Sequence, residues 1–94
     1  MTTSQIKVEL FGIPRLRAGV AEFFVEVDSH QRTLENVFIQ IEKDLPDLAR
    51  ELFVDGQLRK DFVVNISGNE FTRSKDKRLA EDDSVLLMSS DAGG

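Results

Sequence analysis

Hydrophobic and polar residues alternate along the first part of the chain. Between residues 5 and 11, apolar side chains occupy every second position: Ile6, Val8 and Leu10. This period of two predicts a half-buried strand. Residues 12–14 (Gly-Ile-Pro) interrupt the pattern, and a loop is expected over residues 15–21. Residues 22–28 are rich in β-formers and predict a second strand, antiparallel to the first because the connection is short.

The next segment has the period of a helix. Apolar residues recur at spacings of three, four and seven: Leu34, Val37, Phe38 and Ile41. Thr33 is the expected N-cap, and Glu35 suits the positive end of the helix dipole. Pro46 must end this helix because it lacks an N–H and restricts the residue before it. Pro46 can also open a short second helix, in which Leu48 and Leu52 share a face.

The second half of the chain alternates turn signals with short apolar segments. Turns are expected at residues 55–56, 67–69 and 81–83, and strands at residues 62–66 and 70–72. Residues 73–78 are charged and expected to be exposed, and Leu79 is an isolated apolar anchor. Residues 85–88 (Val-Leu-Leu-Met) form a continuous apolar run, which predicts a strand buried on both faces.

This order of elements predicts an α+β domain with one main helix packed across one mixed sheet. The last strand reads as central, so we expect it to pair in parallel with the first. The expected organisation is a single domain over residues 1–88, followed by a flexible tail over residues 89–94.

Composition excludes several kinds of chemistry. The 94-residue chain is 40% hydrophobic, which suits one compact core. It has no Cys and one His, so disulfides, cysteine catalysis and thiolate metal sites are excluded, and no metal site is expected. The net charge of −5 argues against nucleic-acid binding. We see neither a secretion signal nor an apolar run long enough to cross a membrane, so we expect a cytoplasmic protein.

Several short motifs resemble a known family. They are residues 10–19 (Leu-Phe-Gly-Ile-Pro-Arg-Leu-Arg-Ala-Gly), Thr33-Leu34-Glu35, Pro46-Asp47-Leu48, residues 63–68 (Val-Val-Asn-Ile-Ser-Gly), and the final run from Leu79 to Gly93-Gly94. Together they resemble the ubiquitin-like sulfur carriers of the MoaD/ThiS type, and most closely the small subunit of molybdopterin synthase. Three features depart from the family pattern: two residues separate Asn65 from Gly68, Ser84 replaces a familiar residue, and Ser89-Ser90 stand where prolines are usual.

The resemblance implies a ubiquitin-like β-grasp fold and a role as a protein co-substrate rather than an enzyme. The Gly94 carboxylate would be adenylated by an adenylyltransferase related to ubiquitin-activating enzyme. That partner uses ATP, and the carrier itself binds no cofactor. A sulfur donor system would convert the adenylate to a thiocarboxylate, which delivers sulfur for cofactor synthesis. In the molybdopterin type, the tail enters the large subunit of the synthase.

A terminal Gly-Gly suits this chemistry physically. Glycine has no Cβ and tolerates most backbone angles, so Gly93 and Gly94 fit a narrow passage to a nucleotide site. Residues 89–94 reach about 20 Å when extended. By chance alone, two final glycines occur in about one chain in 200, so the pair is informative mainly because it follows a predicted buried strand.

Further residues are candidates for partner binding: Arg15, Phe62, Met88, Ser89, Ser90, Asp91 and Ala92. The resemblance implies that Arg15 fixes the loop or the tail, or contacts the activating enzyme; the alternative is a solvated loop charge. An apolar patch on the sheet is the usual docking surface of ubiquitin-like proteins. Its candidates are Leu58, Phe62, Val64, Leu86 and Met88, most of which we expect to be core.

Two other functions remain open. In the first, the chain is a protein modifier, and the same activated carboxylate forms isopeptide bonds with lysines. In the second, it is a β-grasp interaction module in which Gly-Gly is incidental. The pathway that would receive the sulfur also stays open.

Overall fold

The computed structural model describes residues 2–89 of the chain. Its elements in order are β1 (Thr3–Leu10), α1 (Ile13–Ala18), β2 (Glu22–Asp28), α2 (Leu34–Asp44), α3 (Pro46–Leu52), β3 (Phe53–Val54), β4 (Gln57–Leu58), β5 (Phe62–Ile66), β6 (Glu70–Thr72) and β7 (Ser84–Ser89). The predicted strands at both ends of the chain, and the helix between them, are therefore confirmed.

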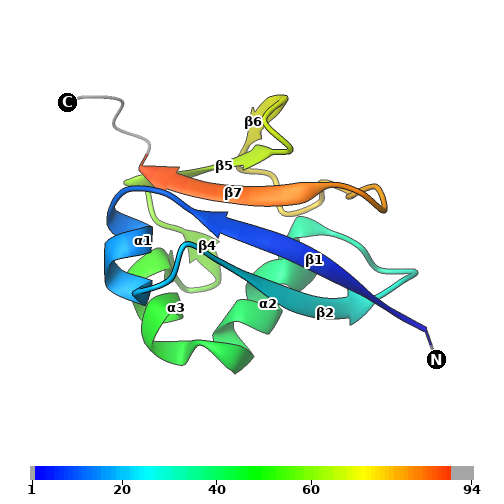
Figure 1. Ribbon diagram of the computed structural model, residues 1–94, viewed down its shortest axis with the longest axis horizontal. Helices are drawn as coiled ribbons and strands as arrows, with labels where there is room; N and C mark the ends of the chain where they lie inside the picture. Colours follow the sequence, from blue (N-terminus) through cyan, green and yellow to red (C-terminus); the bar gives the residue numbers. More distant parts are fainter. Residues whose placement is uncertain (1, 90–94) are drawn as a thin grey trace.

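Five strands form one mixed sheet in the order β2-β1-β7-β5-β6 (Figure 1). β1 pairs antiparallel with β2 and parallel with β7, and β5 pairs antiparallel with both β7 and β6. The last strand is thus central, and its parallel pairing with the first strand is as predicted. β3 and β4 form a separate two-stranded hairpin, in which Asp55 and Gly56 both have positive φ.

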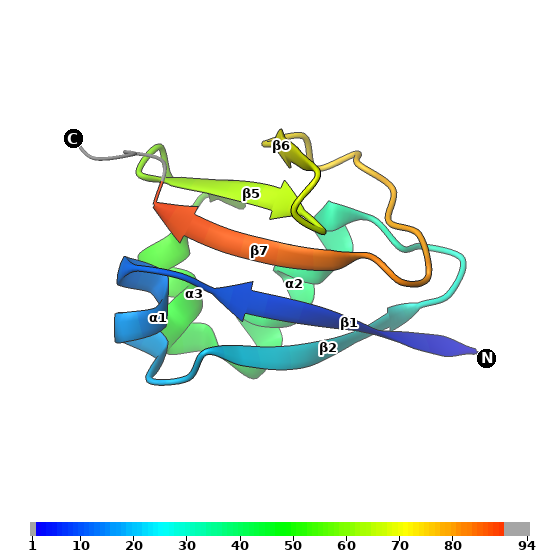
Figure 2. The same cartoon turned by 45° about the horizontal axis from the view of Figure 1, so that its top comes forward.

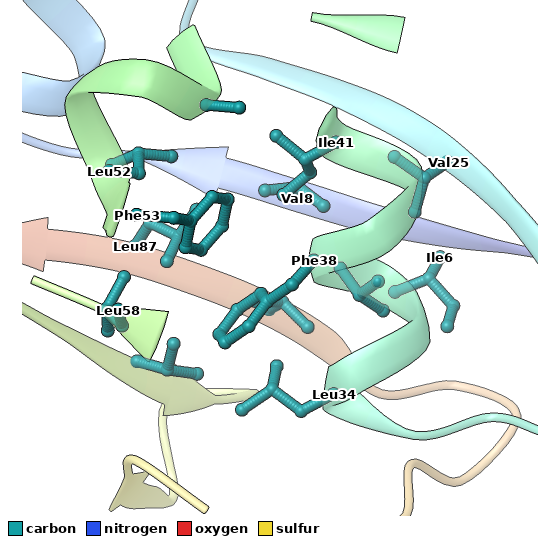
Figure 3. Packing of buried hydrophobic residues seen from close by; sticks show 14 of the residues in the cluster. Ile6, Val8, Val25, Leu34, Phe38, Ile41, Leu52, Phe53, Leu58 and Leu87 are labelled. Atoms are coloured by element: carbon teal, nitrogen blue, oxygen red, sulfur yellow. The ribbon is translucent and has the colours of Figure 1, made fainter. Parts of the chain in front are cut away.

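The helices α2 and α3 cover one face of the sheet, as Figure 2 shows. Thr33 caps α2 by accepting a hydrogen bond from the Asn36 N–H at 3.3 Å. The predicted helical stripe is buried in full and packs on the alternate residues of the strands that face it (Figure 3). Phe38 of α2 and Phe53 lie with ring centroids 4.7 Å apart in this core.

One predicted loop is a helix. Residues 15–21 were expected to be irregular, whereas α1 spans Ile13–Ala18 and lies at the end of β1 (Figure 1). Pro14 occupies the first turn of α1, where its missing N–H leaves no hydrogen bond unmade. Gly19 ends the helix in the left-handed conformation, with φ of 76°.

The prediction that β7 is buried on both faces is wrong. Burial alternates along the strand, with Val85 and Leu87 fully buried against the helices. Leu86 and Met88, on the opposite face, are only half-buried. No helix covers that second face in the described part of the chain, and we call it the outer face (Figure 2).

Candidate docking face and base of the tail

The described chain ends at Ser89, the last residue of the central strand. Ser89 pairs with Phe62 of β5, so it belongs to the sheet, although the sequence had placed it in the tail. On the other side of β7, the pairing with β1 ends two residues earlier at Leu87, whose carbonyl accepts a hydrogen bond from the Phe11 N–H at 2.9 Å. β7 is therefore paired on both sides up to Leu87, and with β5 alone over Met88 and Ser89.

Gly12 packs closely against this strand end. Its backbone has φ 65° and ψ −132°, a combination that only glycine adopts readily. A Cβ at this position would lie 3.4 Å from the Ser89 Oγ. Gly12 thus lets the chain pass from β1 into α1 directly beside the base of the tail.

A cavity of about 480 Å³ opens at the same end of the molecule. Its lining comes from α1, α3, the segment between β4 and β5, and the end of β7: Ile13, Arg17, Glu51, Arg59, Asp61, Phe62 and Ser89. The charges in this lining balance, and Arg17 forms an ion pair with Glu51 at 3.7 Å. The cavity is lined by both apolar and charged residues and lies beside the end of β7.

The structure separates two residues that were predicted to bind a partner together. Phe62 is 5% exposed and belongs to the core, and it reaches the surface only as part of the cavity lining. Met88 lies on the outer face, where it pairs with Val63. Two of the other patch candidates, Leu58 and Val64, are core residues as expected.

The outer face has an apolar half and a half that is polar apart from Phe24 of β2, which lies opposite Lys7 and is 55% exposed. On β1, Lys7 forms ion pairs with Glu9 and with Glu22 of β2. The other half, over β7, β5 and β6, carries four apolar side chains: Val63, Phe71, Leu86 and Met88. Phe71 is 64% exposed. A contiguous apolar area at the centre and edge of a sheet is typical of a protein-docking surface.

Asn65 lies within this apolar half, a position that its sequence context did not predict. It pairs with Leu86 on β7 and with Phe71 on β6, so the three side chains form one row across the face. Asn65 is 6% exposed, and its Oδ1 is shielded and accepts no hydrogen bond from the described residues.

Arg15, the predicted contact to an enzyme or the tail, is exposed on α1. Its side chain makes no hydrogen bond or ion pair with residues 2–89, so it is available to a partner. The remaining predicted site residues lie outside the described range: Ser90, Asp91, Ala92, Gly93 and Gly94.

Arg73 has a positioning role that sequence reasoning missed. Its guanidinium donates to the carbonyls of Phe62, Leu58 (2.9 Å) and Arg59 (3.0 Å). These carbonyls belong to the segment that forms one wall of the cavity. Arg73, which directly follows β6, therefore fixes that wall, whereas the sequence suggested only a solvated charge.

Residues 2–89 contain no group of three or more His, Asp or Glu side chains arranged to hold a metal ion. Among the helices in this range, none is both long and apolar enough to cross a membrane.

Comparisons with known proteins connect this arrangement to a set of solved structures. No family model matches the chain, and no curated protein matches it by sequence. The crystal structure of SAMP1 from Haloferax volcanii is similar, with a TM-score of 0.81, 23% identity, and coverage of 97% of this chain and 100% of that one.

Two further structures extend the likeness. The small archaeal modifier protein 1 of Methanosarcina acetivorans has a TM-score of 0.74 and 22% identity, with both chains covered in full. The protein assigned as molybdopterin converting factor subunit 1 of Pyrococcus furiosus has a TM-score of 0.70 and 23% identity, over 92% of this chain and 97% of that one. The chain therefore has the ubiquitin-like β-grasp fold shared by these modifier and molybdopterin-factor structures, as its sequence motifs predicted.

Proposed function

We propose that this protein is a ubiquitin-like sulfur carrier whose working group is the Gly94 carboxylate. One observation carries the proposal: the central strand ends at Ser89, beside an uncovered apolar face, and the sequence continues from there into Ser90-Asp91-Ala92-Gly93-Gly94. Extended, those five residues span at most about 18 Å. A partner that docks on the outer face can therefore receive Gly94 in an active site of its own.

The chemistry begins with activation, because a carboxylate is a poor acyl donor. A Gly94 oxygen attacks the α-phosphorus of ATP in the partner, and pyrophosphate leaves. A hydrosulfide equivalent from a sulfur donor system then attacks the carbonyl carbon, and AMP leaves with the electrons of the C–O bond. The product is a thiocarboxylate. Its ionised sulfur is the nucleophile that is delivered to an acceptor, which we take to be an intermediate of molybdopterin-type cofactor synthesis.

The fold supplies recognition and reach in this scheme, and the partner supplies the catalysis. An adenylyltransferase related to ubiquitin-activating enzyme would contact Met88 and Leu86 on the outer face and Arg15 on α1. The large subunit of a molybdopterin synthase would use the same face and tail afterwards. Since ATP is consumed, we place the reaction in the cytoplasm.

A second candidate shares the first step. If a lysine amine attacks the adenylate instead of sulfur, the product is an isopeptide bond and the chain is a protein modifier. The similarity to two proteins named as small archaeal modifiers favours this candidate. Both functions need Gly94 and the same activating partner, so only the product distinguishes them.

The deciding measurement is the intact mass of the protein purified from its own cells, under non-reducing and amine-free conditions. A fraction heavier by the difference between one sulfur and one oxygen, absent when Gly94 is deleted, is the expected result. In parallel, immunoblots of a tagged chain test for a ladder of conjugates that Gly94 deletion removes. A ladder without the heavier mass would favour the modifier. If neither product forms and no enzyme accelerates ATP–pyrophosphate exchange with the chain, the carrier proposal is overturned and a binding module remains.

A further inference from the structure

The position of Asn65 conflicts with its surroundings. β5 lies inside the sheet, and the neighbours of Asn65 in its cross-strand row are Leu86 and Phe71. Asn65 is 6% exposed, and its Oδ1 atom has lost its contacts with water without accepting a hydrogen bond from the described residues. An apolar residue of similar size would make the isolated domain more stable at this position.

The neighbour of Asn65 on the outer side of the row is an exposed side chain at the edge of the sheet. Phe71 is the middle residue of the three-residue strand β6, which lies at the edge of the sheet. Its ring is 64% exposed and lies outside the buried core cluster. A partner that packs against Phe71 can therefore rearrange it and reach the Asn65 carbonyl without disturbing the core.

We propose that Asn65 is the polar recognition point of the outer face, at which the Oδ1 atom accepts a hydrogen bond from an N–H donor of the adenylating enzyme. Leu86, Met88 and Phe71 provide apolar contacts around that hydrogen bond and exclude water from it. A single acceptor within an apolar area also selects among partners, because a surface without a matching donor leaves the Asn65 carbonyl buried and unpaired. The inference rests on the proposed function, since it names a recognition residue for the same activating partner.

The test compares Asn65→Leu with the wild-type chain in ATP–pyrophosphate exchange, using an adenylating enzyme that accepts the wild type. We expect the melting temperature of the variant to rise by about 4 °C or more, because an unsatisfied buried carbonyl is removed. We expect the KM for the carrier chain to rise roughly tenfold with kcat unchanged, because docking loses a hydrogen bond and the chemistry at Gly94 does not change.

Gln5→Leu is the matched control. It makes a comparable amide-to-leucine change at an exposed site in the polar half, opposite Glu26, and KM should stay at the wild-type value. Chains cut after Ala92 provide a second readout, since they cannot be adenylated at Gly94 yet retain the face. As competitive inhibitors, they should lose potency by the same factor when they carry Asn65→Leu.

Each other outcome would overturn the inference. A more stable Asn65→Leu chain with an unchanged KM and inhibition constant would show that the enzyme does not use the carbonyl. A less stable variant would show that Asn65 already has a structural role in the free chain. A change in self-association alone would assign the face to a second copy of the chain. If no enzyme adenylates the wild type, the proposed function fails first, which is a separate result.

Discussion

At the scale of single residues, arginine side chains hold together parts of the chain that have little regular structure. Arg32 is 7% exposed, and its guanidinium donates to the carbonyls of Leu79 (3.2 Å) and Ala80. We expect Arg32→Met, which keeps the aliphatic stem, to lower the free energy of unfolding by about 2 kcal/mol, because these carbonyls lose their donors. Urea unfolding measures the difference.

The exposed Arg78 is the control for this prediction. Its one side-chain hydrogen bond to the described residues, to the His30 carbonyl, is long at 3.5 Å. Arg78→Met should therefore leave the unfolding free energy within about 0.5 kcal/mol of wild type. Equal losses in the two variants would contradict the role assigned to Arg32.

Sequence patterns do not identify such residues. Arg73 lies in a charged stretch and is exposed for the most part, yet its donors satisfy three backbone carbonyls 11 to 15 positions away. Asn65 follows two valines in a strand, and nothing in that pattern indicates an unpaired carbonyl. In both cases, the hydrogen-bond partner of the side chain, or its absence, depends on which strands become neighbours. Local periodicity carries no information on strand neighbours.

At the scale of elements, β7 offers an internal comparison between its two faces. Leu87 is fully buried against the helices, and Leu86 is half-buried on the outer face. We expect Leu87→Ala to cost about 2–5 kcal/mol of unfolding free energy, because it leaves a cavity in the core. Leu86→Ala should cost roughly 1 kcal/mol or less, and instead raise the KM of the chain for its activating enzyme.

Chemical denaturation and exchange kinetics of the two variants test this division. A Leu86→Ala chain as unstable as Leu87→Ala would mean that both faces of β7 are structural. If the Leu86→Ala chain is stable and its KM is unchanged, the activating enzyme does not dock on the outer face.

Elements with a strong period were predictable, and those without one were not. The stripe of α2, with Thr33 before it and Pro46 after it, gave that helix its correct limits. α1 has only six residues and no apolar stripe, and its one buried side chain is Pro14. Its signals were the early proline and the following Gly19, which together favour a short helix. The apolar run of β7 did not show whether one or both faces of the strand are buried, because an exposed apolar face and a core face have the same composition.

At the scale of the whole molecule, the core ends before the chain does. Every member of the buried core cluster lies between Ile6 and Leu87. We therefore expect a chain that stops at Ser89 to have the melting temperature of the full chain, although it cannot be activated. A chain that stops before Ser84 lacks the central strand and should not fold. Differential scanning calorimetry checks both, and a large loss of stability on removing only residues 90–94 would contradict the prediction.

The sequence predicted the arrangement of sheet and main helix because these depend on patterns that cover many residues. The candidate site was predictable only in part. Gly93 and Gly94 were proposed from their order in the sequence, and they lie outside the described residues. The separation of Phe62 and Met88 onto different faces follows from the register of β5 against β7, which the sequence did not specify.

The central position of β7 has a mechanical consequence. A partner that draws Gly94 into its active site pulls on β7 along the strand axis, and β7 is hydrogen-bonded to β1 on one side and β5 on the other. A force along the strand axis loads these hydrogen bonds together, in shear. A force that peels away an edge strand would instead break its hydrogen bonds one after another. In the proposed carrier function, the domain can therefore stay folded while a partner pulls on the chain beyond Ser89.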